Sequence, residues 1–97
     1  MSTLLSDQEI AGALTALKGW SREGSEMVAT FKFASYLAGI VFVNEVARIA
    51  EAQNHHPDIH IGWRKVILRV STHSAGGLTE KDVALARAIN EVAPLSS

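Results

Sequence analysis

The sequence predicts an α+β fold in which helices pack on one face of an antiparallel sheet, in the order helix, two strands, helix, two strands, helix. Three observations support this fold class. Apolar residues recur at helical spacing in three segments, at the start, the middle and the end of the chain. Between these segments stand two pairs of strand-like segments, each pair joined by a short turn. Antiparallel strand pairs separated by helices are typical of α+β proteins.

The first helix begins after Ser6, because Ser6-Asp7-Gln8-Glu9 is a capping box in which the first and last side chains satisfy each other's backbone amides. Its apolar stripe runs as far as Leu17, and Gly19 ends the helical segment. Residues 20–22 and 27–33 are predicted to be the first strand pair, around a turn that contains glycine. The residues of the second strand that share one face are Met27, Ala29, Phe31 and Phe33.

The second helix is predicted to start at the cap Ser35 and to run to about Gln53. Pro57 disfavours helical geometry at His56, so the helix stops there at the latest. Its first half is apolar nearly all round, and a helix without a polar face needs cover on two sides. A chain of 97 residues has little material for a second cover. We therefore expect a partner subunit to supply it. The apolar residues are Tyr36, Leu37, Ala38, Ile40, Val41, Phe42 and Val43.

The second strand pair is expected at residues 59–62 and 65–71, with Val66, Leu68 and Val70 on one face of the second strand. A turn over residues 74–77 follows. Thr79 caps the last helix, in which Asp82 is favourable to the helix dipole because it lies in the first turn. Val83, Ala86, Ile89 and Ala93 form its apolar stripe, and Pro94 ends it.

Composition bounds the function. The 97 residues suit one domain, residues 1–97. Nine Lys and Arg against ten Asp and Glu exclude a polybasic arm as the main binding device, so we expect no nucleic-acid partner. The absence of cysteine excludes disulfides and thiol catalysis. The longest apolar stretch, residues 36–43, is far shorter than the ~20 residues that span a bilayer, and Met1–Ser6 has no secretory-signal features. We expect a soluble, cytoplasmic protein.

The histidines mark the place where chemistry should be sought, because all four lie between positions 55 and 73. Glu51 precedes His55 by four residues, so on a helix the two side chains can touch, and a nearby carboxylate stabilises the imidazolium form. A two-residue loop at Trp63-Arg64, counted outward, puts Thr72 opposite His55 and His73 opposite Asn54. A loop at Gly62-Trp63 would instead put His73 opposite Ala52. The two groups of histidines are thus expected to converge at the open end of one hairpin.

Four interpretations compete for this cluster. His55 and His56 can simply end a helix, with His73 on the surface. The cluster could supply ligands to a metal ion, but the sequence has no His-x-x-x-His helix pair and no cysteine. Nucleophilic hydrolysis by Ser71 or Ser74 is a weaker interpretation, because the sequence has no Gly-x-Ser-x-Gly motif. Metal-free acid–base catalysis fits the residue types, because an unperturbed imidazole, which titrates near pH ~6.5, both holds and releases a proton at neutral pH. The candidate metal ligands are His55, His56, Asp58, His60 and His73.

The spacing Glu51-x3-His55-His56-Pro57-x5-Trp63-x9-His73-x8-Asp82 resembles the signature of the pterin-4a-carbinolamine dehydratases, also called 4a-hydroxytetrahydrobiopterin dehydratases. Gly19-Trp20, the entry Phe31-Lys32-Phe33 into the long helix, and the run from Gly77 to Asp82 agree with it. The similarity covers nearly the whole chain. It implies a four-stranded antiparallel sheet with helices on one side, and dimers assembled into tetramers through helix contacts.

The resemblance also implies the reaction. Members remove water from 4a-hydroxytetrahydrobiopterin to give quinonoid dihydropterin, which recycles the cofactor of aromatic amino-acid hydroxylases, and they use neither a metal nor an organic cofactor. Position by position, His55 and His73 correspond to the acid–base pair. His56 corresponds to a binding and orienting residue that shares proton transfer, with Glu51 as its acidic companion.

Two further expectations concern the role of Trp20 and a rival function for the protein. Trp20 is a candidate to cover the flat pterin, although a single Trp is more often a core residue. The rival function, from a different class, is a non-catalytic dimerisation or assembly cofactor on the same fold. The presence of His55, His56 and His73 together favours the enzyme.

Overall fold

The computed structural model describes residues 3–93 and has the predicted order of elements. The elements are α1 (Asp7–Thr15), β1 (Trp20–Glu23), β2 (Glu26–Lys32), α2 (Tyr36–Gln53), β3 (Asp58–Gly62), β4 (Lys65–Val70), the short 3₁₀ helix η1 (His73–Ala75) and α3 (Glu80–Val92). This is an α+β fold built on a four-stranded antiparallel sheet, as the sequence predicts.

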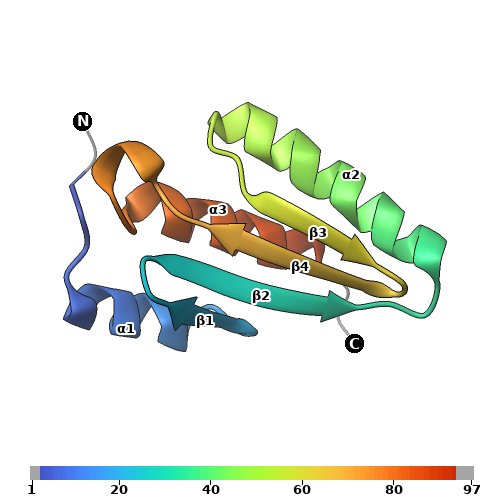
Figure 1. Ribbon diagram of the computed structural model, residues 1–97, viewed down its shortest axis with the longest axis horizontal. Helices are drawn as coiled ribbons and strands as arrows, with labels where there is room; N and C mark the ends of the chain where they lie inside the picture. The colour runs from blue at the N-terminus through green and yellow to red at the C-terminus, as the bar shows by residue number, and fades with distance from the viewer. Residues whose placement is uncertain (1–2, 94–97) are drawn as a thin grey trace.

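The sheet has the strand order β1-β2-β4-β3, so β2 and β4 lie at its centre (Figure 1). In the second hairpin Gly62 pairs with Lys65 and Ile59 with Leu68, which is the register that a loop at Trp63-Arg64 requires. Arg64 takes a positive φ of 61° in that loop. The predicted register of the hairpin is therefore confirmed over the length of β3.

One face of the sheet carries the core. In β4 the side chains of Val66, Leu68 and Val70 are buried, and in β2 those of Met27 and Ala29 are buried on the same face. Strand residues alternate between faces, so this pattern places the helices on one side of the sheet. The helices add further buried side chains to the same core: Ile10 from α1, Phe42, Val46 and Ile49 from α2, and Val83, Leu85, Ala86 and Ile89 from α3.

Both long helices begin as predicted and α2 also ends where it was predicted to end, but the end of α1 differs from expectation. The α1 helix stops at Thr15 and is followed by a tighter turn, which keeps Leu17 buried and ends at Gly19 with a φ of 87°. The α2 helix ends at Gln53 because Asn54 adopts the left-handed conformation and closes it, three residues before Pro57. The predicted stop of the last helix at Pro94 lies outside the described residues.

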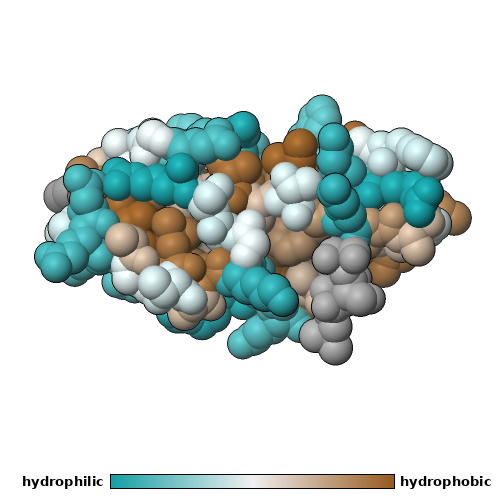
Figure 2. Space-filling model, turned by 90° about the horizontal axis from the view of Figure 1, so that it is seen from below, coloured by the Kyte–Doolittle hydropathy of each residue, from teal (hydrophilic) through white to brown (hydrophobic). Residues whose placement is uncertain are grey.

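The first half of α2 has an uncovered side. Tyr36, Leu37 and Val41 are large apolar side chains that are 50%, 70% and 64% exposed, while Phe42 faces the core. On the side of α1 and β1, by contrast, apolar patches are bordered by polar side chains (Figure 2). Within residues 3–93, none of the helices is long and apolar enough to cross a membrane.

Candidate active site

Four segments meet at one end of the sheet and bring the predicted site together. They are the loop between α2 and β3, the end of β4, η1, and the start of α3 (Figure 1). Asn54 makes the approach of the first segment possible, because its left-handed backbone turns the chain out of α2 immediately before His55. The amide of His55 still bonds to the carbonyl of Ala50, so the loop leaves the helix in a fixed direction.

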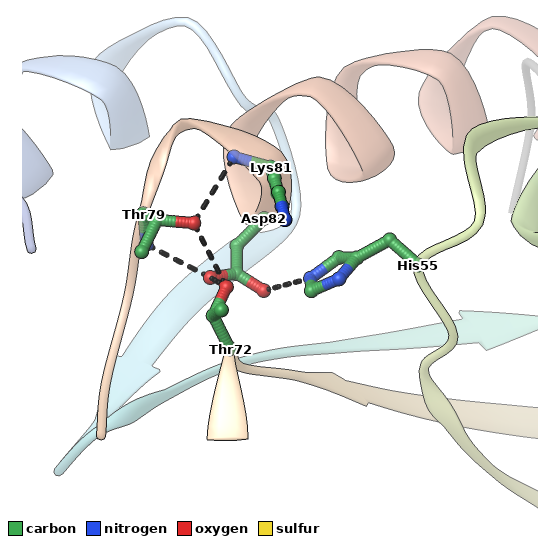
Figure 3. A network of polar contacts seen from close by, with 5 residues as sticks. All are labelled: His55, Thr72, Thr79, Lys81 and Asp82. Carbon is green, nitrogen blue, oxygen red and sulfur yellow. Dashed lines mark hydrogen bonds and ion pairs between the residues drawn. The ribbon is translucent and has the colours of Figure 1, made fainter. Parts of the chain in front are cut away.

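His55 is held by a buried carboxylate. Its Nε2 lies 2.7 Å from Oδ1 of Asp82, and the two side chains are 12% and 0% exposed (Figure 3). The other oxygen of Asp82, Oδ2, accepts hydrogen bonds from the Thr72 hydroxyl at 2.7 Å and from the Thr79 amide at 2.9 Å. Burial of a carboxylate costs free energy unless donors satisfy it, and here three donor groups surround it.

His56 is paired as well, but at the surface. Its Nε2 lies 2.5 Å from Oε2 of Glu51, and the two side chains are 54% and 79% exposed. Helical spacing predicts that Glu51 contacts His55, and the structure gives this carboxylate to His56 instead. The reason is that α2 ends at Gln53, so His55 is no longer on the helix face that Glu51 occupies.

His73 is exposed at the start of η1, directly after Thr72. It lines an open cleft of about 430 Å³ between the β1–β2 turn and residues 71–77. That cleft is not lined by His55 or His56. The side chains of His55 and of Thr72, the residue before His73, both contact Asp82, so these two segments meet at that carboxylate. A pocket shared by all three imidazoles stays a prediction.

The cleft beside His73 carries charge. Glu23 and Glu26 line it, and both accept hydrogen bonds from Arg69 on β4, at 3.0 and 3.3 Å. The hydrogen bond that Arg69 donates to Glu23, together with the negative charge of Glu23, raises the pKa of the Arg69 guanidinium. Two carboxylates against one guanidinium leave the wall of the cleft formally negative.

Trp20 lies in the hydrophobic core and not beside the histidines. Its ring is only 6% exposed and packs edge-on against Phe31. Its indole N–H donates to Oδ1 of Asn90, which lies eight residues beyond Asp82 on α3 and so about 12 Å along the helix axis. The proposed contact of Trp20 with substrate therefore gains no support from its position.

The imidazoles and carboxylates described above can donate and accept protons. His60 is exposed on β3 and takes no part in the contacts of His55 and His56 described above. Within residues 3–93 no group of three or more His, Asp or Glu side chains gathers in a geometry that can hold a metal ion.

Comparison with known proteins identifies the family. A family model described as pterin 4 alpha carbinolamine dehydratase matches residues 3–92. The chain belongs to this family. A protein of Roseiflexus sp. (strain RS-1), provisionally named a pterin-4-alpha-carbinolamine dehydratase, is 53% identical over 92 residues, 95% of this chain and 99% of the relative.

Solved structures agree with this placement in the carbinolamine dehydratase family. A Brucella melitensis protein described as a transcriptional coactivator/pterin dehydratase has a TM-score of 0.91 and 32% identity, covering 95% of this chain and all of that one. A pterin dehydratase-like protein described as a RuBisCO assembly factor has a TM-score of 0.61 and 22% identity, covering 74% of this chain and 83% of its own. The second likeness concerns the fold alone.

The network around Asp82 is the part of the candidate site that sequence reasoning missed. The sequence assigns Asp82 to the helix dipole and to the family signature, but gives it no partner. Two signals point to the contact. The spacing of Thr79 and Asp82 is that of a capping box, and the hairpin register, counted on beyond the pair Asp58 and Arg69, reaches Thr72 opposite His55.

Proposed function

We propose that this protein is a 4a-hydroxytetrahydrobiopterin dehydratase that works by histidine acid–base catalysis. The single observation that carries the proposal is the hydrogen bond between His55 and the buried Asp82, two signature positions far apart in the sequence. Membership of the family supplies the substrate class.

The reaction needs two proton transfers. The C4a–O bond breaks, the N5–H proton leaves, and its bonding electrons form the C4a=N5 double bond of the quinonoid product. Hydroxide is a poor leaving group, so an acid must protonate the departing oxygen while a base takes the N5 proton. Each such assistance is typically worth ~10²–10⁴-fold. No external electron donor or acceptor is required.

We assign these transfers to His55 and His73, with His56 and Glu51 binding and orienting the pterin and His56 sharing proton transfer. Support comes from the fixed ring of His55 and from the cleft that His73 lines. The pair of His56 and Glu51 offers a hydrogen-bonding edge at the surface, suited to the polar edge of a pterin. Trp20 remains the least supported member of the set, because it is buried in the core.

We also propose that the protein assembles into dimers or tetramers through the exposed side of α2, which carries Leu37 and Val41. Its cellular role would be cytoplasmic recycling of tetrahydrobiopterin beside an aromatic amino-acid hydroxylase. The family supports this role.

A dehydratase assay tests the activity. We expect the wild-type protein to accelerate the loss of water from 4a-hydroxytetrahydrobiopterin, and His55→Ala to lose most of this acceleration while keeping its circular dichroism spectrum. A wild-type protein that leaves the uncatalysed rate unchanged would overturn the proposal.

In that case the second candidate is a non-catalytic assembly or dimerisation cofactor. The exposed apolar side of α2 and the 75% exposed Trp63 favour it, because such surface is typical of protein contacts. The Brucella melitensis relative, described as both coactivator and dehydratase, adds weight to it.

A further inference from the structure

Asp82 is surrounded by groups that can donate hydrogen bonds to it, and this decides which nitrogen of His55 is free. One oxygen of the carboxylate is occupied by Thr72 and Thr79, and the other faces His55. The carboxylate is wholly buried, so water has no access to it. Among residues 3–93, no buried side-chain nitrogen or oxygen lacks a partner.

Figure 3 shows the hydrogen bonds of the network, and the hydrogen of each bond can be assigned in turn. Thr72 has a single hydroxyl hydrogen, and it points to Oδ2 of Asp82. The contact of 2.8 Å between the hydroxyls of Thr72 and Thr79 is therefore made with the hydrogen of Thr79. Thr79 in turn accepts the amide hydrogen of Lys81 at 3.2 Å. Every hydrogen runs toward Asp82, as an ionised carboxylate requires.

An ionised carboxylate only accepts hydrogen bonds, so the imidazole must donate from Nε2. Neutral histidine carries one ring hydrogen, which leaves Nδ1 with a free lone pair. We propose that Asp82 is a positioning residue that fixes His55 as the Nε2–H tautomer and makes Nδ1 the atom that exchanges a proton with the pterin. This inference rests on the proposed function for the pterin, but the tautomer itself does not.

The pair formed by His56 and Glu51 provides an internal contrast. It has the same chemistry, with Nε2 on a carboxylate oxygen. Both of its side chains are more than half exposed, so water competes for each group. A fixed tautomer is expected at His55 and not at His56.

Nitrogen-15 NMR of the histidine rings tests the tautomer without substrate. In the wild-type protein at a pH where His55 is neutral, we expect long-range proton–nitrogen spectra to show a protonated Nε2 and an unprotonated Nδ1. A protonated Nδ1 beside a bare Nε2 would overturn the inference, and this result needs no variant to fold.

Asp82→Asn then tests the cause. The amide oxygen of asparagine can accept from Thr72 and Thr79, which leaves the NH₂ group facing His55. Because this group donates to Nε2, the ring must change to the Nδ1–H tautomer, and Nδ1 can no longer take a proton. We expect kcat to fall by ~10²–10⁴-fold while KM changes much less.

Two matched controls remove the same charge elsewhere. Glu51→Gln is expected to leave the His55 tautomer as it is in the wild type. Asp58→Asn, an exposed aspartate on β3, is expected to leave both the tautomer and the rate unchanged. Retention of the Nε2–H tautomer in folded Asp82→Asn would overturn the role of Asp82. If the wild type shows the expected tautomer but no dehydratase activity, the proposed function fails while the pairing of Asp82 with His55 stands.

Discussion

His73 is the exposed member of the three candidate catalytic histidines, and its ring contributes little to packing. Its replacement should therefore affect chemistry more than folding. We expect His73→Ala to lower kcat by ~10²–10⁴-fold, the value of one lost proton transfer, with a much smaller rise in KM. Steady-state kinetics measures both. Turnover close to wild type in a folded protein would show that His73 is not part of the acid–base pair.

Thr72 has the opposite character, because it is buried and its hydroxyl satisfies Asp82. We expect Thr72→Val, which keeps the shape but loses the donor, to lower the free energy of unfolding by ~1–3 kcal/mol. Thr72→Ser keeps the hydroxyl and should cost less. Urea denaturation gives both values. A loss for Thr72→Ser as large as that for Thr72→Val would mean that packing of the threonine methyl group contributes as much to stability at this position as the hydrogen bond does.

At the scale of single residues, local spacing predicted the caps well and the partner of His55 badly. Ser6 and Thr79 both cap helices as expected, because a capping box depends on only four consecutive residues. The contact between His55 and Asp82 joins residues 27 positions apart, and only the folded chain brings them together. A spacing argument that stops at the helix selects Glu51, which the structure pairs with His56.

At the scale of elements, the register of β3 and β4 could be predicted because a two-residue loop leaves one pairing. A shift by one residue would turn Leu68 from the core to solvent, so burial enforces the same register. The end of α2 was predicted at about Gln53 and is found there, but the residue that closes the helix was not predicted. Pro57 sets an outer limit, but the left-handed Asn54 decides where the helix stops.

Asn54 therefore offers a prediction for the α2–β3 connection. Its φ of 51° is a conformation that Asn tolerates, that Gly adopts freely and that Ala resists. We expect Asn54→Ala to lower the free energy of unfolding by ~1 kcal/mol or more, and Asn54→Gly to be close to neutral. Thermal and urea denaturation compare the pair. If the alanine variant were as stable as the glycine variant, backbone strain would not be what shapes this corner.

At the scale of the whole molecule, the sequence predicted the sheet and the helical layer but not the cleft beside His73. The cleft is bounded by Glu23 and Glu26 of the first hairpin and by residues 71–77, which follow β4. No periodic pattern relates these segments. The uncovered side of α2 was predictable, because its residues are consecutive and apolar all round.

That uncovered side allows a test of assembly. Leu37 and Val41 are the most exposed large apolar residues of α2, so burial of both in a partner interface would add hydrophobic stabilisation of roughly 25 cal/mol per Å². A glutamate there would place a charge in the interface without disturbing the monomer core. We expect Leu37→Glu and Val41→Glu to shift the mass measured by light scattering toward the monomer, with unchanged circular dichroism. Ala52→Glu, at an exposed position in the second half of α2, should keep the wild-type mass. A monomeric wild type, or an unchanged mass in both α2 variants, would exclude this side of the helix as the interface.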